Sequence, residues 1–308
     1  MPDKESSLSV IIPTLNGAQW LKSILPILEQ QTRAPDEILV VDSQSTDETL
    51  DLARSHNARV ITVQREKFDH GGTRTMAASL AVGDILVYMT QDAVPADSRA
   101  LENLIAPFAD KRVAAAYGRQ IPSPGATFSA RHLRVFNYPA ESSVKCWEDR
   151  KKFGFKTAFI SNSFAAYRKN LLAEAGFFPD GLLFGEDTLA AARLLQNGYC
   201  VAYVAEARVQ HSHSYSVLQE FRRYFDIGVF HSLHQELLTC FGTLNGEGRR
   251  YIISEFRQLA GDKDYLRLPE SALRSSMKFL AYNLGKRYSC LPRRVAVFCS
   301  MNRGWWFK

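Results

Sequence analysis

Hydrophobic runs alternate with amphipathic segments along the first third of the chain. The runs predict strands at residues 8–12, 38–41, 59–63 and 85–90, and the segments between them predict helices at 20–31 and 73–81. Apolar strands that alternate with helices are typical of βαβ units, in which helices cover both faces of a mostly parallel sheet. The pattern therefore predicts an α/β fold.

The alternation becomes less regular after residue 118. Residues 126–156 suggest an insertion rich in aromatic and charged side chains, followed by a strand pattern at 157–167, a helix at 187–196 and a strand at 199–204. From residue 217 onward the pattern is helical. We therefore expect one sheet-containing domain at 1–216 and a helical C-terminal region at 217–308.

Charge is distributed unevenly between these regions. Residues 1–220 contain 23 Lys and Arg against 25 Asp and Glu, whereas residues 221–308 contain 15 against 7, and residues 271–308 carry eight cations and no acid. Basic and aromatic side chains in a helical pattern suit an anionic membrane surface. The alternatives are a basic helix packed on the first domain and a nucleic-acid contact. No apolar run reaches the roughly 18 residues of a membrane span.

The cysteines of the chain are scattered and lack the spacing of a metal site. They are Cys146, Cys200, Cys240, Cys290 and Cys299. An odd, unpaired set suggests a reduced protein without structural disulfides. Residues 1–7 are polar and charged, which argues against a secretory signal. We therefore expect a cytoplasmic protein that associates peripherally with the inner face of the cell membrane.

Polar residues follow the predicted strands at the edge of the sheet where open α/β folds bind ligands. Thr14 and Asn16 follow the first strand, and Asp42 and Ser45 follow the second. These four are candidates for binding a nucleotide, because a carboxylate or hydroxyl there can contact a base or a ribose. Asp42 and Ser45 also suit the start of the next helix, and spacing alone favours this capping role over nucleotide binding.

A carboxylate, Asp92, ends the fourth strand, and Gln91 beside it is a further candidate for the nucleotide. A divalent cation that bridges a diphosphate needs an oxygen ligand, so Asp92 is the candidate ligand for Mg²⁺ or Mn²⁺. His211 and His213 follow the last strand, and we expect only one of them, preferably His211, to complete the site. The alternative is that both histidines are ordinary loop residues.

The segment at residues 70–74 offers backbone amides at a helix start and a guanidinium, which together suit a diphosphate. Gly71 and Arg74 are therefore candidate donor-binding residues, although Gly-Gly before a helix is more often a simple turn. Glu186 and Asp187 open another helix. A carboxylate there can act as general base toward an acceptor hydroxyl, and we prefer Asp187 to Glu186. The alternative for either acid is a structural role in the first helical turn.

Taken in order, three motifs resemble glycosyltransferase family 2, whose members have the GT-A fold. They are residues 10–16 (VIIPTLN), 40–47 (VVDSQSTD) and 185–187 (GED). The resemblance implies an inverting transfer from a nucleotide sugar, with Asp42 at the base, a metal at Asp92 and Asp187 as catalytic base. Where the family usually has Asp-x-Asp, this chain has Thr90-Gln91-Asp92, so the first carboxylate of the metal site is absent.

A narrower set of motifs resembles the rhamnosyltransferases of that family, which use dTDP-L-rhamnose. They are residues 68–74 (FDHGGTR), 117–122 (YGRQIP), 161–168 (SNSFAAYR) and 211–216 (HSHSYS). The resemblance implies a role in cell-surface polysaccharide assembly, such as that of O-antigen, with a lipid-linked saccharide as acceptor. It places Arg119, Gln120, Asn162 and Arg168 on the acceptor side.

Three alternatives remain open at this point. They are a family 2 enzyme with another nucleotide sugar, a sugar-phosphate nucleotidyltransferase, and a nucleic-acid-binding protein that uses the basic C-terminal region. A nucleotidyltransferase usually has a Gly-rich basic loop after the first strand, which residues 15–18 (LNGA) lack. The slightly acidic first domain and the absence of a known nucleic-acid-binding motif argue against the third.

Overall fold

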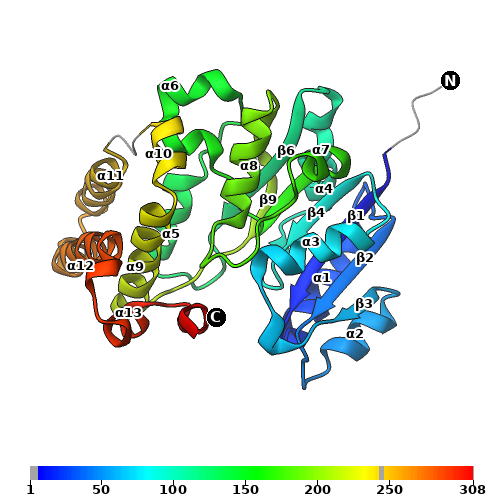
Figure 1. Cartoon of the computed structure of the whole chain (residues 1–308), viewed down its shortest axis with the longest axis horizontal. Coiled ribbons are helices and arrows are strands. Elements are labelled where there is room, and N and C mark those ends of the chain that lie inside the picture. Colours follow the sequence, from blue (N-terminus) through cyan, green and yellow to red (C-terminus); the bar gives the residue numbers. More distant parts are fainter. Residues whose placement is uncertain (1–5, 243–245, 308) are drawn as a thin grey trace.

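A β-sheet runs through the middle of the molecule, with helices on both of its faces (Figure 1). The computed structural model describes residues 6–242 and 246–307. Its strands are β1 (Leu8–Thr14), β2 (Glu37–Asp42), β3 (Arg59–Thr62), β4 (Ile85–Met89), β5 (Val94–Pro95), β6 (Val113–Ile121), β7 (Ser143–Lys145), β8 (Phe164–Arg168) and β9 (Cys200–Gln210). Its α-helices are α1 (Ala18–Glu29), α2 (Thr49–Ser55), α3 (His70–Leu80), α4 (Ala100–Ile105), α5 (Phe128–Asn137), α6 (Arg150–Phe153), α7 (Lys169–Glu174), α8 (Glu186–Gln196), α9 (Val217–Leu233), α10 (Gln235–Phe241), α11 (Glu247–Gly261), α12 (Leu268–Lys286) and α13 (Arg293–Cys299).

The sheet is parallel in its first half and mixed in its second. Within the described residues the strand order is β3-β2-β1-β4-β8-β6-β9-β5, with β7 paired to β9. Strands β3, β2, β1 and β4 lie side by side in this order. Each is parallel to the next, as the alternation of strands and helices predicts. Strand β8 runs antiparallel between β4 and β6, whereas β6 and β9 are parallel. The α/β class with a helical C-terminal region is confirmed.

Alternate side chains of the buried strands enter two different hydrophobic cores. Ile11 and Tyr88 face one core, to which α3 and α8 contribute, whereas Val10 and Val87 face the other, to which α1 and α4 contribute. Neighbouring residues in a strand point to opposite faces, so a strand that is apolar throughout must be covered on both sides. This explains why these strands stand out in the sequence as unbroken apolar runs.

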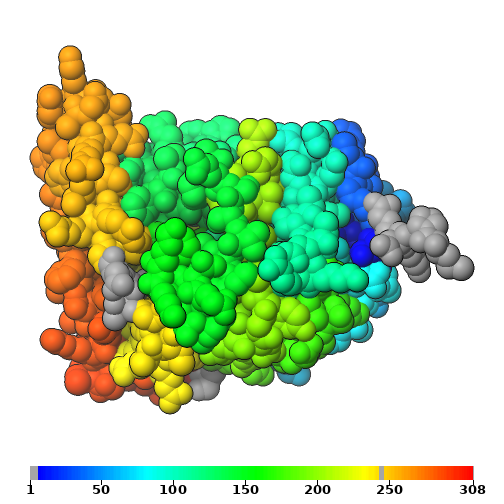
Figure 2. All heavy atoms as spheres, turned by 90° about the horizontal axis from the view of Figure 1, so that it is seen from above, coloured from blue at the N-terminus to red at the C-terminus, as the bar shows by residue number. Residues whose placement is uncertain are grey.

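The C-terminal helices pack on the sheet-containing region. Phe225 of α9 and Ala281 of α12 share a third hydrophobic core with Leu183, which lies in the loop before α8. Helices α9 and α12 touch through glycines, because a side-chain carbon added at Gly228 or Gly285 would come within 2.2 or 2.0 Å of the other helix's backbone. Figure 2 shows these helices at the end of the molecule farthest from the first strands.

The outer surface of this region exposes apolar side chains. Phe279 and Phe298 are 72% and 61% exposed, whereas Trp305 and Trp306 are partly buried. Lys308 lies outside the described residues. No helix in the described part of the chain combines the length and the apolar character that a membrane span requires.

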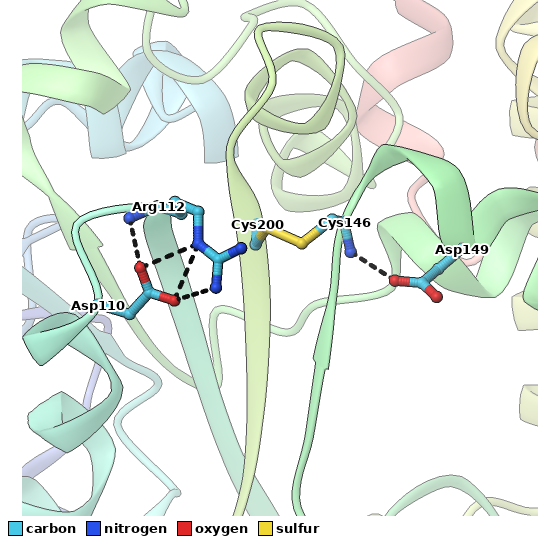
Figure 3. Close-up of a disulfide and its surroundings, with 5 residues drawn as sticks. All are labelled: Asp110, Arg112, Cys146, Asp149 and Cys200. Carbon is cyan, nitrogen blue, oxygen red and sulfur yellow. Dashed lines mark hydrogen bonds and ion pairs between the residues drawn. A yellow bond between two sulfur atoms is a disulfide. The ribbon is translucent and has the colours of Figure 1, made fainter.

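A disulfide joins Cys146 to Cys200 (Figure 3). Strand β7 runs antiparallel to β9 with Lys145 opposite Val201, so the residue after Lys145 comes opposite the residue before Val201. The Cα atoms of the two cysteines are 4.3 Å apart. The prediction that no cysteine is paired is therefore wrong for these two, because only the sheet brings together residues that are 54 positions apart.

Candidate active site

Hydrogen bonds made by side chains connect the loops that follow β1 and β2. Ser45 accepts a hydrogen bond from the Asn16 N–H at 2.7 Å and donates one to Asp42, which also accepts from the Thr14 hydroxyl. Helix α2 begins only at Thr49 and has no side-chain cap, so the capping alternative for Asp42 and Ser45 is wrong. The four candidate nucleotide residues lie together around the buried Asp42 carboxylate.

Gln91 holds the first of these loops in place. Its amide exchanges two hydrogen bonds with the backbone of Leu15, accepting from the N–H at 2.9 Å and donating to the carbonyl at 3.2 Å. The loops after β1 and β4 are therefore connected directly, and this connection positions the neighbouring Asp92.

Asp92 lies against both histidines of the segment that follows β9. Strand β5 pairs with the end of β9, with Val94 opposite Gln210, and this brings the residues before β5 to those after β9. The carboxylate oxygens of Asp92 are 3.4 Å from Nε2 of His211 and 3.8 Å from Nε2 of His213. The ligand atoms of the three residues lie within 4.8 Å of one another. The sequence prefers His211, whereas the structure brings both together, since residues two apart in an extended chain share a face.

Gln120 orients His211. Its amide oxygen accepts a hydrogen bond from Nδ1 of His211 at 2.9 Å, and its amide nitrogen donates to the Ser161 hydroxyl at 3.0 Å. A proton on Nδ1 leaves Nε2 as the atom that faces Asp92, and this is the arrangement in which an imidazole binds a cation. Gln120 is only 2% exposed, so it lies behind a candidate metal ligand and does not face an open cleft.

The protonation states of this cluster also suit a cation. Burial disfavours the charged form of Asp92, but its hydrogen bond with His211 outweighs this effect and holds the pKa of Asp92 well below its ordinary value. Burial, and then the neighbouring His211, lower the pKa of His213 to about 4, so its imidazole is neutral near pH 7. A carboxylate oxygen beside two imidazole nitrogens is a donor set that divalent transition-metal ions accept. The residues present therefore fit a divalent cation.

Arg74 is engaged within the protein. Its guanidinium donates to the Glu186 carboxylate at 2.8 Å, and the two side chains are only 6% and 7% exposed. Gly71 packs against the carbonyl oxygen of Pro179, which a side-chain carbon would approach to 1.7 Å. The start of α3 therefore positions Glu186, and Gly71 serves the close packing of α3 on the loop before α8.

Asp187 lies next to Glu186 at the start of α8, where two backbone N–H groups hold its carboxylate. The N–H of Asn162 donates at 3.2 Å and that of Thr188 at 2.7 Å. Burial, and then the negative charge of Glu186, raise the pKa of Asp187 to about 6. A carboxylate whose pKa lies near neutrality is well suited to take a proton from a hydroxyl.

A continuous chain of neighbouring residues connects the two acids that the sequence singles out. Asp92 contacts His211, which hydrogen-bonds to Gln120. Gln120 bonds to the residue before Asn162, and Asn162 donates to Asp187. The candidate metal ligands and the candidate base therefore belong to one site at the ends of β4, β6 and β9 and the start of β8.

Arg168 lies away from this site. Its guanidinium donates to the backbone carbonyls of Val113 and Phe108 at the far end of β8. Strand β8 is antiparallel to β4, so Phe164, its first residue, lies opposite Met89 at the end of β4 that leads to the site. Arg168, the last residue of β8, therefore lies at the opposite edge of the sheet.

Arg119 also lies apart from the other candidate acceptor residues. It neighbours Gln120 on β6, and side chains that are adjacent on a strand point to opposite faces. Its charge acts on the buried Tyr203 on that other face. Of the four candidate acceptor residues, the structure brings Gln120 and Asn162 to the site.

The structure adds residues that the sequence does not single out. Tyr138, just after α5, lies near Asp187, and burial raises its pKa to about 12, so it stays a neutral hydroxyl. Arg134 on α5 and Arg223 on α9 place positive charges near Asp92 and His213. These residues lie in segments without a recognisable motif. The density of aromatic and basic side chains at 126–156 is the only sequence signal for Arg134 and Tyr138, and Arg223 has none.

The C-terminal residues contact the loop before α8. Trp305 donates from its indole N–H to the carbonyl of Gly181 at 2.8 Å, and the Asn302 side chain donates to the carbonyl of Leu183 at 2.9 Å. A cavity of about 320 Å³ lies between these residues and the loop that ends at His70. The C-terminus therefore supports the loop that leads into Glu186 and Asp187.

The chain is similar to a known family over more than half of its length. A family model described as Glycosyl transferase family 2 matches residues 9–176. The O-antigen chain rhamnosyltransferase RfbN of Salmonella typhimurium is 42% identical over 301 residues, which cover 97% of this chain and 96% of the relative. The O-antigen chain rhamnosyltransferase WbaN of Salmonella anatum is 41% identical over 303 residues, with the same coverage.

Two solved structures have a similar fold at low sequence identity. The mannosyltransferase PcManGT from Pyrobaculum calidifontis, in complex with GDP-Man and Mn²⁺, has a TM-score of 0.60 at 20% identity and covers 99% of this chain and 88% of that one. TarS of S. aureus, in complex with UDP-GlcNAc, has a TM-score of 0.56 at 17% identity and covers 96% and 84%. These two likenesses concern the fold.

Proposed function

The chain belongs to glycosyl transferase family 2 and has the GT-A fold, and from this premise we propose that it transfers L-rhamnose from dTDP-β-L-rhamnose to a saccharide acceptor in O-antigen assembly. Two relatives that match almost the entire chain carry the name O-antigen chain rhamnosyltransferase, which supports rhamnose as the transferred sugar. A lipid-linked acceptor belongs to the same proposal. The nucleotidyltransferase and the nucleic-acid-binding alternatives are set aside by the family membership.

The observation that carries this proposal is the connection between Asp92 and Asp187. A transferase needs an oriented base within reach of the acceptor hydroxyl and a separate group that neutralises the departing diphosphate. Asp187, which the Asn162 N–H orients and whose pKa is about 6, suits the base. Asp92 and its two histidines suit the diphosphate side.

In the proposed reaction Asp187 takes the proton of the acceptor hydroxyl. The freed oxygen attacks the anomeric carbon of the donor sugar from the face opposite to dTDP, so a β-linked donor gives an α-L-rhamnoside. Arg74 pairs with Glu186 and offsets part of the negative charge that acts on the base. Burial of this pair also keeps the start of α8 rigid, so that Asp187 meets the acceptor in a fixed position.

The proposal includes a divalent cation, Mn²⁺ or Mg²⁺, held by Asp92, His211 and His213. When bound, such an ion would offset the negative charge that develops on the diphosphate. Imidazole nitrogen suits transition-metal ions better than Mg²⁺, so Mn²⁺ is the better fit to this donor set.

The nucleotide of the donor would lie over the loops after β1 and β2. Thr14, Asn16 and Ser45 surround Asp42, whose buried carboxylate already accepts from Ser45 and Thr14. We propose that this hydrogen-bonded group forms the wall against which the base and ribose bind, with residues 1–216 as the catalytic domain.

We also propose that the outer face of the C-terminal region binds an anionic membrane surface from the cytoplasmic side. Phe279 and Phe298 are exposed in this region, and so are its cations Lys286, Arg287 and Arg293. Apolar side chains that enter the headgroup region and cations that pair with lipid phosphates act together in such binding. Replacing both phenylalanines by Ser should reduce sedimentation with anionic vesicles, whereas Val82→Ser, at an equally exposed apolar residue outside this region, should not.

Donor profiling tests the proposed function. The full-length protein is incubated with dTDP-β-L-rhamnose, UDP-glucose, UDP-galactose and GDP-mannose, and release of the nucleoside diphosphate is measured with saccharide acceptors. The proposal expects dTDP release and an α-linked rhamnoside, and Asp187→Asn should abolish transfer while dTDP binding persists. Preferred turnover of a UDP-sugar or GDP-sugar would replace rhamnose by that sugar, and near-normal turnover of Asp187→Asn would remove Asp187 from its role.

A further inference from the structure

Two arginine side chains near Asp92 have no acidic partner. Within the described part of the chain, neither Arg134 nor Arg223 takes part in an ion pair, and Nε of Arg134 is buried without any hydrogen-bond partner. Enclosing an unpaired guanidinium is costly, and proteins normally supply such a group with an anion. Arg134 is partly buried and no acidic side chain among the described residues neutralises its charge, whereas the unpaired Arg223 is exposed and accessible to a ligand.

The two arginines come from helices that flank the histidine segment after β9. Helix α5 is tied to this segment because the N–H of Thr127, its N-cap residue, donates to the Ser214 hydroxyl at 3.1 Å. Helix α9 follows the same segment directly, and Ser216 caps it. Both helices begin at the histidine segment. Arg134 and Arg223 each lie about two turns from the start of their helix, so both arginines are at a similar distance from that segment.

Aromatic rings hold both guanidinium groups beside the site. The Arg223 guanidinium lies 4.7 Å from the centre of the Phe184 ring, and Phe184 comes directly before the turn into Glu186 and Asp187. The Arg134 guanidinium lies 5.9 Å from the centre of the Tyr138 ring. A guanidinium over a ring keeps its N–H groups free at its edge, where they can donate to a ligand.

The charges of Arg134 and Arg223 act on each other and on the Asp92 cluster. Arg134 interacts electrostatically with Asp92 and with Arg223, and both arginines interact with His213. Two positively charged groups are therefore placed where an anion held at the Asp92 cluster would meet them.

We propose that Arg134 and Arg223 bind the diphosphate of the nucleotide donor together with the Asp92 cluster, which deepens the proposed function and rests on it. A guanidinium presents two parallel N–H groups that match two phosphate oxygens. When the bond between the anomeric carbon and the β-phosphate oxygen breaks, its electron pair stays on that oxygen, and the two arginines stabilise the added charge. Arg74, the arginine that the sequence assigns to this task, is committed to Glu186.

The experiment compares ligands that differ by one phosphate. Isothermal titration calorimetry of the full-length protein with Mn²⁺ measures the affinity for dTDP and for dTMP, and for UDP and UMP. Arg134→Gln and Arg223→Gln should each weaken dTDP binding by about 10-fold or more and dTMP binding by less than about 3-fold, because only the diphosphate loses a charge-assisted contact. Arg134→Lys, which keeps the charge but loses the planar fork, should fall between Arg134→Gln and the wild type.

Two neighbouring arginines provide matched controls. Arg131→Gln changes an exposed residue one turn earlier on α5, and Arg222→Gln changes the residue beside Arg223, whose guanidinium faces Phe298 instead. Both controls should bind dTDP as the wild type does. Equal losses for dTDP and dTMP, or losses in the controls as large as in the two test variants, would overturn the proposal. Wild-type protein that binds UDP but not dTDP would refute only the choice of nucleotide, because the comparison of UDP with UMP still measures the diphosphate contact.

Discussion

Replacing Arg74 by Ala should destabilise the fold and leave binding of the nucleotide largely unchanged. The Arg74–Glu186 pair is separated by 2.8 Å, with side chains only 6% and 7% exposed. At an effective dielectric constant of about 20, the attraction across that distance is about 6 kcal/mol. Part of it is offset by the cost of removing both charges from water. Loss of one partner from such a buried pair costs about 3–5 kcal/mol, because the other charge stays buried and unpaired.

The double replacement of Arg74 by Met and Glu186 by Gln separates the cost of an unpaired buried charge from the net contribution of the ion pair. It removes both charges and leaves no orphaned ion, so the free energy of unfolding should recover to within about 2 kcal/mol of the wild type. Arg65→Ala is the matched control, because Arg65 is exposed and its loss should change stability by at most about 0.5 kcal/mol.

Urea unfolding followed by tryptophan fluorescence measures stability, and calorimetric titration of the folded variants measures the affinity for dTDP. The structure predicts a large loss of stability for Arg74→Ala with dTDP affinity within about twofold of the wild type, since Arg74 is turned toward Glu186. A stability loss below about 1 kcal/mol, accompanied by a drop in dTDP affinity of about tenfold, would refute this reasoning. That result would return Arg74 to the diphosphate role that the sequence suggests.

Three further predictions concern the base, the metal and the disulfide. The value of kcat/KM should fall about tenfold per pH unit below pH 6, because only ionised Asp187 accepts a proton; a flat profile down to about pH 5 would exclude it. Gln120→Ala should raise the Mn²⁺ concentration for half-maximal activity by about 10- to 100-fold, since His211 loses its orientation; an unchanged requirement would contradict this. Replacing Cys146 and Cys200 by Ser should lower the free energy of unfolding by up to about 4 kcal/mol without slowing transfer, as urea unfolding and a rate assay would test.

The sequence predicts the donor half of the site because its signals are local. Each apolar run there ends in a polar residue, and parallel strands bring their carboxyl ends to the same edge of the sheet. This logic places Thr14, Asp42 and Asp92 near one another without knowledge of the rest of the fold. The Glu186–Asp187 pair is likewise predicted from a local signal, because two acids stand at the start of a periodic helix.

The remainder of the site depends on pairings that no local pattern encodes. Arg168 lies at the wrong edge for an acceptor residue because β8 runs antiparallel to β4, and a run of apolar residues does not reveal its direction. The Cys146–Cys200 disulfide follows from the register of β7 on β9. Arg134 and Arg223 reach the site because two helices leave the histidine segment together, and the sequence shows them only as ordinary charges in amphipathic stretches.

The contact between Gly228 and Gly285 ties α12 closely to α9. Two backbones meet there with nothing between them, and the same helices cover Leu183, beside the turn that presents Asp187. A stop codon that removed α12 would uncover the inner side of α9 and take away the support of that turn. The basic C-terminal region is therefore part of the support of the active site. A fusion protein that contained only the N-terminal part would keep the nucleotide-binding sheet, but its catalytic base would be poorly positioned.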